Sequence, residues 1–191
     1  MKRKDLDLFI DPREIETERL FLKKITVKDL IDVYEYTSDP TVSEFLLWSK
    51  HRSIEYTKEY LLYIEYLYKK CKFFDFGIKL KESGKMIGTC GFSKFDFLKN
   101  SAYVGYVLNS KFWGLGYAGE ALSAVLKFGF DTLQLSSIGA ELMEENVRSK
   151  RLLEKLGFHK TKKTREMRVK GSSRLIIRYE ITRESFEGNK S

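Results

Sequence analysis

The sequence predicts one α+β domain with a central, mixed but mostly antiparallel sheet of six to seven strands and about four helices. Strand-like and helix-like segments alternate in the order one strand, two helices, three strands, helix, strand, helix, two strands. Only KESG separates two of these strands, which is typical of a hairpin that turns at Ser83 and Gly84. The 191 residues are 42% hydrophobic and contain no linker-like stretch, so they fill a single core.

The first strand and the first two helices occupy the N-terminal third of the chain. In the strand ERLFLKKI, Leu20 and Leu22 share one face. The helix over TVKDLIDVYEYTSD begins after Thr26, a residue type that caps helices well. A longer helix covers SIEYTKEYLLYIEYLYKKC, and its apolar stripe consists of Leu61, Ile64, Tyr68 and Cys71.

The remaining elements follow the hairpin of FFDFGIKL and KMIGTCGFSKF. SAYVGYVLN is the next strand, and a glycine-rich turn leads from it to a helix from Tyr117 to Leu133. The apolar face of this helix consists of Leu122, Val125, Leu126 and Gly129. The strand SIGAELM, the helix NVRSKRLLEKLG and the strands FHKTKKTREMRV and SRLIIRYEIT complete the domain. We expect the domain to span 1–191, with loose ends at about 1–14 and 185–191.

The net charge of +8 favours a polyanionic ligand or partner, such as a phosphorylated cofactor, a ribosome or a nucleic acid. Much of this charge lies in HKTKKTREMRVKG, which the alternation predicts to be the solvated face of a strand pair rather than a nucleic-acid patch. No apolar run approaches the roughly 20 residues of a membrane span. We therefore expect a cytoplasmic protein without a membrane partner.

The cysteines and histidines do not indicate a metal site. Cys71, Cys90, His51 and His159 lack the spacing of metal ligands. Two cysteines are also too few for a disulfide framework. We expect neither a bound metal nor a Cys/His nucleophile pair.

The stretch GLGYAG, from Gly114 to Gly119, fits the dinucleotide-binding pattern G-x-G-x-x-G. A dinucleotide fold needs this turn directly at a strand's end, followed by several alternating strands and helices. Here five residues separate Leu108 from Gly114, and only one more strand-helix pair follows. The loop can still bind a phosphate group, because glycines allow the backbone to approach an anion closely and a helix N-terminus binds anions. The loop is predicted to bind a different phosphate group.

Together with three other blocks, this loop resembles the GNAT family of N-acetyltransferases, and within it the RimJ/RimL-like acetyltransferases of ribosomal proteins. In that family the loop Gln/Arg-x-x-Gly-x-Gly/Ala holds the pyrophosphate of acetyl-CoA. WGLGYA matches it at Gly116 and Ala118, with Trp113 in place of Gln or Arg. The other blocks are ETERLFLKKIT, VGYVLN and ENVRSKRLLEKLGF. The resemblance implies the GNAT fold, with splayed fourth and fifth strands, and acetyl-CoA as co-substrate.

The resemblance also implies roles for individual residues. Ser149 is a candidate to protonate the leaving thiolate, although Asn146 and Ser149 are also explained by a simple helix cap and an exposed serine. Lys150, Arg151 and Lys155 are candidate partners of the 3′-phosphate. The residues implied to contact acetyl-CoA are Val107, Leu108, Trp113, Gly114, Leu115, Gly116, Tyr117, Ala118, Asn146 and Ser149.

The reaction implied is direct attack of a primary amine on the thioester, which requires a base for the ammonium group. Related enzymes often place a glutamate before the Gly-Tyr of the fourth strand, where this chain has Tyr103 and Val104. Glu141, Glu144 or a water chain are the substitutes, and Glu141 is our candidate catalytic base.

The acceptor remains open. It is a protein N-terminal Ser or Ala, as in the RimJ/RimL-like enzymes, or a small amine such as an amino acid, a polyamine or an antibiotic. Trp48, the tyrosine-rich helix and the last hairpin are expected to form its wall. A non-catalytic CoA-binding protein and a ribosome- or RNA-binding protein are the alternatives, with nucleic acid the less favoured partner. Both a monomer and a homodimer agree with the sequence.

Overall fold

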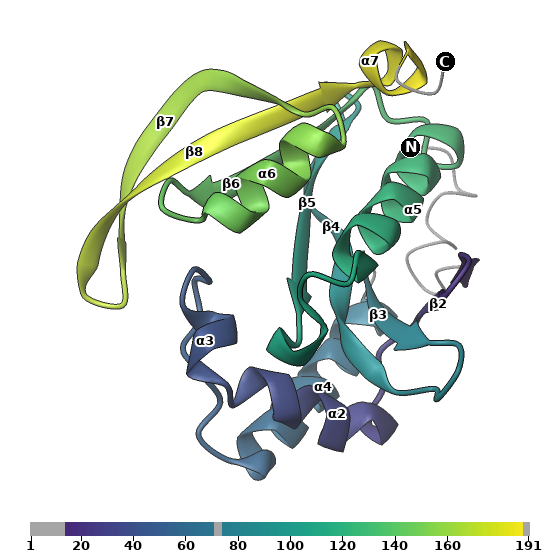
Figure 1. Ribbon diagram of the computed structural model, residues 1–191, viewed down its shortest axis with the longest axis vertical. Helices are drawn as coiled ribbons and strands as arrows, with labels where there is room; N and C mark the ends of the chain where they lie inside the picture. Colours follow the sequence, from purple (N-terminus) through teal and green to yellow (C-terminus); the bar gives the residue numbers. More distant parts are fainter. Residues whose placement is uncertain (1–13, 71–73, 189–191) are drawn as a thin grey trace.

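The structure is a computed structural model that describes residues 14–70 and 74–188 (Figure 1). These residues form one eight-stranded sheet in the order β1-β2-β3-β4-β5-β6-β8-β7. Every neighbouring pair is antiparallel except β5 with β6, which is parallel. The mixed, mostly antiparallel sheet is therefore confirmed. Its extra strand is β1, whose two residues are too few to show a periodicity in the sequence.

The predicted strands and long helices are all present, and two short helices are additional. α3 has only four residues, and α7 lies partly in the stretch from 185 that we expected to be a loose end. The strands are β1 (Ile15–Glu16), β2 (Leu20–Lys23), β3 (Phe74–Leu80), β4 (Met86–Asp96), β5 (Ser101–Leu108), β6 (Ser137–Met143), β7 (His159–Val169) and β8 (Ser172–Thr182). The helices are α2 (Leu30–Thr37), α3 (Pro40–Ser43), α4 (Ile54–Lys69), α5 (Tyr117–Asp131), α6 (Val147–Lys155) and α7 (Arg183–Gly188), with 3-10 helices η1 (Val27–Asp29) and η2 (Ser110–Phe112).

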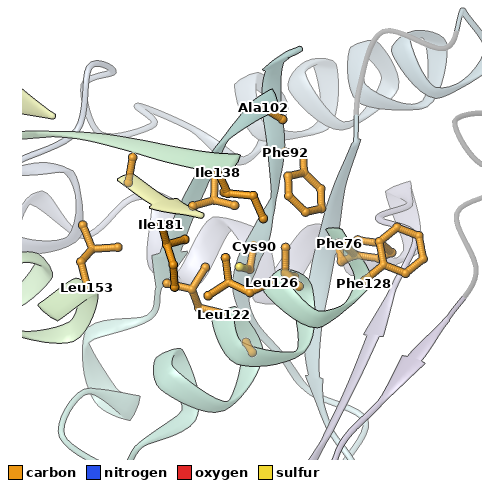
Figure 2. Close-up of a cluster of buried hydrophobic side chains, with 14 of the residues drawn as sticks. Phe76, Cys90, Phe92, Ala102, Leu122, Leu126, Phe128, Ile138, Leu153 and Ile181 are labelled. Atoms are coloured by element: carbon orange, nitrogen blue, oxygen red, sulfur yellow. The ribbon is translucent and has the colours of Figure 1, made fainter. Parts of the chain in front are cut away.

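The main core lies between the sheet and α5, and α6 adds to it. Leu122 and Leu126 of α5 point toward Cys90 and neighbouring residues of the sheet (Figure 2). The predicted apolar face of α5 is confirmed, because Leu122, Val125, Leu126 and Gly129 are all buried. Leu153 of α6 belongs to the same cluster, so both helices that follow the parting strands pack on this side.

A second core joins α2 and α4 to the opposite face of the sheet. Val33 of α2 and Leu61, Ile64 and Tyr68 of α4 are each at most 2% exposed, as their helical spacing predicts. Met86, at the start of β4, packs against them. Cys71, the fourth residue of the predicted stripe, lies outside the described residues.

The sheet divides between β5 and β6. These strands pair at only three positions, where Ser101–Tyr103 face Ser137–Gly139. Beyond them β5 continues to Leu108 and β6 to Met143 without pairing to each other. At the last pair the Tyr103 ring covers Gly139, where a Cβ atom would lie 3.1 Å from the ring. We call this parting of β5 and β6 the fork.

The β7–β8 hairpin extends to one side of the fork, and its tip lies near α3 (Figure 1). Lys170 at the tip donates a hydrogen bond to the backbone oxygen of Ser43. Val169 and Ile176 of the hairpin form a small apolar cluster against which Phe45 packs. These contacts connect the hairpin to the segment between α3 and α4 across the fork.

Gly129 allows a close approach of α5 to the sheet. A Cβ atom there would lie 2.7 Å from Phe92 Cζ and 2.9 Å from Ile138 Cδ1. Gly129→Ala should gain about 1 kcal/mol of helix propensity but lose about 1–3 kcal/mol to overpacking. We expect a net loss of roughly 1 kcal/mol in the free energy of unfolding, measured by urea denaturation.

Gly119→Ala in the same helix is the matched control for this substitution. A Cβ atom at Gly119 would meet only Leu152 Cδ1, at an ordinary 3.5 Å. This variant should be as stable as the wild type or more so. A Gly129→Ala protein at least as stable as the Gly119→Ala protein would contradict the close approach.

Candidate active site

A cavity of about 440 Å³ opens at the fork. Its wall combines the end of β5, the glycine loop, the beginnings of α5 and α6, and residues of the α3 region. Nine residues of the predicted acetyl-CoA site line it together: Val107, Leu108, Trp113, Gly114, Gly116, Tyr117, Ala118, Asn146 and Ser149. The tenth, Leu115, is not in this wall: its side chain is 54% exposed and its carbonyl accepts a hydrogen bond from Arg19.

The glycine loop presents the uncapped N-terminus of α5 to the cavity. Gly114 and Gly116 have φ angles of 77° and 85°, in the left-handed region that favours glycine. Gly116 is the N-cap residue and has no side chain to bond the first turn. The N–H groups of the residues after it, from Tyr117 to Gly119, have no acceptor within the helix. With the positive end of the helix dipole, these donors fit an anionic phosphate group.

Glu120, in the first turn of α5, connects the glycine loop to the segment before β2. Its carboxylate accepts hydrogen bonds from Thr17 Oγ1 at 2.6 Å, from the Arg19 backbone N–H at 2.8 Å and from Arg19 Nε at 2.7 Å. Burial alone would raise the pKa of Glu120, but these hydrogen bonds outweigh it and lower the pKa. The Arg19 guanidinium also lies 4.4 Å from the centre of the Tyr117 ring. The segment ETER, residues 16–19, and the glycine loop therefore form one structural unit.

Trp113 begins the loop and joins it to both β5 and α6. Its indole N–H donates to the Leu108 carbonyl at 2.8 Å. The Arg148 guanidinium lies 3.6 Å from the centre of the Trp113 ring, in a cation–π contact. Arg148 thus brings a cation from α6 to the loop position where the family pattern has Gln or Arg. Apart from the place of Arg148 between Asn146 and Ser149, nothing specific in the sequence predicts this contact.

The first turn of α6 faces the end of β5. The Asn146 side-chain oxygen accepts the Ser149 N–H at 3.1 Å, so Asn146 caps α6, and both residues line the cavity. Tyr106 lines it too, and its buried hydroxyl has no hydrogen-bond partner of ordinary geometry among the described residues. Burial raises the pKa of Tyr106 to about 12, which the nearby Ser149 hydroxyl partly offsets. Sequence reasoning missed Tyr106, although it lies within the VGYVLN block.

Glu141, our candidate base, lies between two cations. Its Oε2 atom lies 2.6 Å from Lys94 Nζ and 3.0 Å from Arg165 Nη2. Burial by itself would raise the pKa of Glu141, but the two cations outweigh burial and lower it. The carboxylate is thus held in its ionised form and is not part of the cavity wall. Glu144, the other carboxylate considered, lies 3.5 Å from Lys160.

Of the three candidate partners for a 3′-phosphate, only Arg151 lines the cavity. Lys150 and Lys155 lie on the same helix but are not part of its wall.

An aromatic cluster forms on the α4 side of the sheet. The His51 ring contacts the rings of Trp48, Tyr56 and Tyr60 with centroid distances of 5.6, 4.9 and 5.4 Å. His51 Nδ1 lies 2.9 Å from Thr57 Oγ1, and burial lowers the pKa of the imidazole. These residues include the Trp48 and α4 tyrosines that the sequence analysis places in the acceptor wall.

Within residues 14–70 and 74–188, no group of three or more His, Cys, Asp and Glu residues is arranged to hold a metal ion. No helix in these residues has the length and apolarity required to cross a membrane.

The family model described as "Acetyltransferase (GNAT) domain" matches residues 19–159. The chain belongs to the GNAT family. It is 34% identical over 163 residues to the uncharacterized N-acetyltransferase p20 of Bacillus licheniformis, covering 85% of this chain and 91% of that protein. It is 33% identical over 100 residues to the [ribosomal protein uS5]-alanine N-acetyltransferase of Escherichia coli, covering 51% of this chain and 50% of the enzyme.

Solved structures show the same fold. A GNAT-family acetyltransferase from Bacillus anthracis superposes with a TM-score of 0.79 at 28% identity, covering 90% of this chain and 99% of that one. The GNAT fold expected from the sequence is confirmed, and the protein is an acyltransferase.

Glu35 of α2 fixes the segment that precedes the glycine loop. Its carboxylate accepts hydrogen bonds from Lys85 Nζ at 2.5 Å, Lys111 Nζ at 2.9 Å and Asn109 Nδ2 at 3.2 Å. The bonds from Lys85 and Lys111 lower the pKa of Glu35 to about 2. One helix thus anchors both β4 and the end of β5.

This lowered pKa predicts a pH-dependent contribution to stability. Because the folded-state pKa lies below the unfolded value, the contribution is complete above about pH 4.5 and is lost as the pH falls toward 2. Glu35→Gln should lower the free energy of unfolding by about 1–2 kcal/mol at pH 7, with a smaller loss at pH 3. Urea denaturation at both pH values measures this difference.

Glu16→Gln provides the control for an exposed ion pair, since the Glu16 side chain that pairs with Lys81 is 67% exposed. It should change stability by less than about 0.5 kcal/mol at pH 7. An equal loss for Glu35→Gln at pH 7 and pH 3 would show that the charge of Glu35 is not what stabilises the fold.

Proposed function

We propose that this protein is an acetyl-CoA-dependent N-acetyltransferase that transfers an acetyl group to a primary amine while both substrates are bound. The observation that carries the proposal is the uncapped N-terminus of α5, which opens through left-handed Gly114 and Gly116 into the cavity at the fork. This arrangement suits a pyrophosphate group. Membership of the GNAT family, whose acetyltransferases use acetyl-CoA, supports the same ligand.

The residues of the cavity suggest how the co-substrate is held. The N–H groups of Tyr117, Ala118 and Gly119 bind the pyrophosphate, and Arg148 and Arg151 supply positive charge from α6. The β5 edge at Val107 and Leu108, which faces the fork, offers backbone groups to the pantetheine arm and to the thioester oxygen. When bound there, acetyl-CoA supplies the activated acetyl group.

Two hydroxyl groups of the cavity are our candidates to supply the proton that the leaving thiolate needs. Ser149 of α6 and Tyr106 of β5 face the same cavity, and the buried Tyr106 hydroxyl lies beside Ser149. Ser149 donates the proton, and Tyr106 orients the serine hydroxyl. Holding both substrates in one cleft contributes much of the rate acceleration.

A protein N-terminal Ser or Ala is our first candidate acceptor. The support is the similarity to the E. coli enzyme that acetylates the alanine of ribosomal protein uS5. The exposed basic residues of β7 favour approach to an acceptor carried on the ribosome. A small amine is the second candidate, because the contact of Lys170 with Ser43 narrows the approach across the fork.

Calorimetry with acetyl-CoA, followed by detection of free thiol, tests the function. We expect binding, and thiol release with Ser- or Ala-terminated peptides or with one of a panel of small amines. Binding without release across the whole panel would replace the proposal with a CoA-binding protein. Absence of binding would refute the site itself.

Ala118→Asp separates ligand binding from folding. A carboxylate in the first turn of α5 is favourable for the helix dipole but repels a pyrophosphate at the same helix end. We expect unchanged or higher thermal stability together with a rise in the acetyl-CoA Kd on the order of 100-fold or more. Ala118→Ser, which adds a neutral side chain, should change the Kd far less. Equal Kd values for the two variants would place the anion elsewhere.

A further inference from the structure

The face of the sheet that α2 and α4 cover contains a carboxylate that the site described above does not use. Asp75 lies on β3 between Phe74 and Phe76, which are 1% and 0% exposed and belong to the α5-side core. Because side chains alternate along a strand, Asp75 points to the opposite face, which α2 and α4 cover. Tyr68 of α4 donates its hydroxyl to the backbone oxygen of Asp75, which places the residue directly beneath that helix.

The Asp75 carboxylate has no hydrogen bond or ion pair with any residue that the structure describes. Burial raises its pKa to about 7. The titratable groups on this side are the hydroxyls of Tyr36 from α2 and of Tyr60 and Tyr68 from α4, whereas the Cys90 thiol of β4 lies on the opposite, α5-side face of the sheet. Burial chiefly raises the pKa of each, and the negative charge of Asp75 raises it further. On the same side, Lys24 Nζ lies 5.2 Å from the centre of the Tyr68 ring.

A row of glycines connects Asp75 to the strand that borders the fork. Asp75 pairs with Gly91 of β4, and Gly91 pairs with Gly105 of β5. Asp75 Oδ1 leans over β4, since a Cβ atom at Gly91 would lie 2.4 Å from it. Gly105 is exposed, and a Cβ atom there would meet nothing within 4 Å. This row of glycines ends at Gly105, two residues before Val107, which is in the cavity wall; Asp75, Gly91 and Gly105 are not part of that wall.

The environments of the two candidate carboxylates differ in the property that a base needs. A general base requires a free lone pair and a pKa close to the working pH. Glu141 has Lys94 and Arg165 on its carboxylate, whereas Asp75 has neither a cation nor a donor among the described residues. Tyr60, whose pKa the charge of Asp75 raises, also contacts the His51 ring of the aromatic cluster in the predicted acceptor wall.

We propose that Asp75 is the general base of the acetyl transfer, receiving the acceptor's ammonium group over the Gly91–Gly105 row of glycines and taking one proton from it, directly or through one water. This inference rests on the proposed N-acetyltransferase function. The freed nitrogen lone pair forms a bond to the acetyl carbon, and the carbon–sulfur bond breaks. The thiolate takes a proton from Ser149, the second proton that leaves the new amide nitrogen returns through water to the serine oxygen, and Asp75 releases its proton to solvent.

The free protein provides a test that does not depend on activity. Carboxyl carbons of aspartate are labelled with ¹³C, and their chemical shifts are followed by NMR between pH 3 and 9. We expect one carboxyl to titrate near pH 7, and its signal to be absent from the spectrum of Asp75→Asn. A titration of Asp75 near the usual value for aspartate would overturn the proposal, whether or not the protein transfers acetyl groups.

The rate of thiol release at saturating acetyl-CoA and acceptor provides the second test. For the wild type, kcat should rise about tenfold per pH unit below pH 7 and level off above it. Asp75→Asn, which preserves the side-chain volume, should lose this rise and lower kcat by roughly 100-fold or more. An acetyl-CoA Kd and a melting temperature equal to those of the wild type would show that the fold and the cofactor cavity are intact in this variant. Glu187→Gln, an exposed change on α7, should leave the profile unchanged.

The remaining outcomes distinguish Asp75 from its rivals. Retention of the rise below pH 7 in Asp75→Asn, with only a higher acceptor KM, would make Asp75 a binding residue and overturn its role as base. Loss of the rise in Glu141→Gln would assign the proton transfer to Glu141 instead. If the wild type releases no thiol with any acceptor, the proposed function fails, and the NMR titration alone decides whether Asp75 is poised to accept a proton.

Discussion

The fork between β5 and β6 is the constraint on which the rest of the molecule depends. Pairing between the two strands stops where the Tyr103 ring covers Gly139. Arg178 Cζ and Lys94 Nζ lie 4.8 and 5.2 Å from the centre of this ring. Beyond that point β5 has a backbone edge without a strand partner on the β6 side. The helices that follow the two strands both begin at this opening, so two positive helix ends converge on one cavity. In the proposed function, an anionic ligand replaces interactions that a continuous sheet would have made between its own strands.

Much of the fold could be predicted because it is encoded in local patterns. The apolar faces of α4 and α5, the hairpin turn at Gly84 and the glycine loop all depend on residues that are close in sequence. Nine of ten predicted contact residues line one cavity for the same reason, since they come from short contiguous blocks. The stacking of Arg148 on Trp113 and the place of Asp75 beneath α4 could not be predicted in this way. They depend on contacts between segments that are distant in sequence, and the periodicity of a segment does not predict such contacts.

Four carboxylates illustrate how surroundings rather than residue type determine a chemical role. Glu120 and Glu35 each accept several hydrogen bonds and serve as anchors, one for the glycine loop and one for the segment before it. Glu141 is neutralised by two cations beside the fork. Asp75 is half-buried without a cation or donor on its carboxylate among the described residues, and burial raises its pKa toward the range in which a carboxylate accepts a proton near neutral pH. Such an arrangement persists where the surrounding tyrosines and strands impose it.

The position of β8 has a consequence for how the chain folds. β8 lies between β6 and β7, although it follows both in sequence, so β6 obtains its antiparallel neighbour only after residues 172–182 have been synthesised. The hairpin tip that contacts Ser43 likewise joins segments more than 120 residues apart. Non-local pairing of this kind slows folding and leaves strand edges exposed in the meantime. During synthesis, the half of the sheet that contains β1 to β5 can assemble first, whereas the fork and its cavity are completed last.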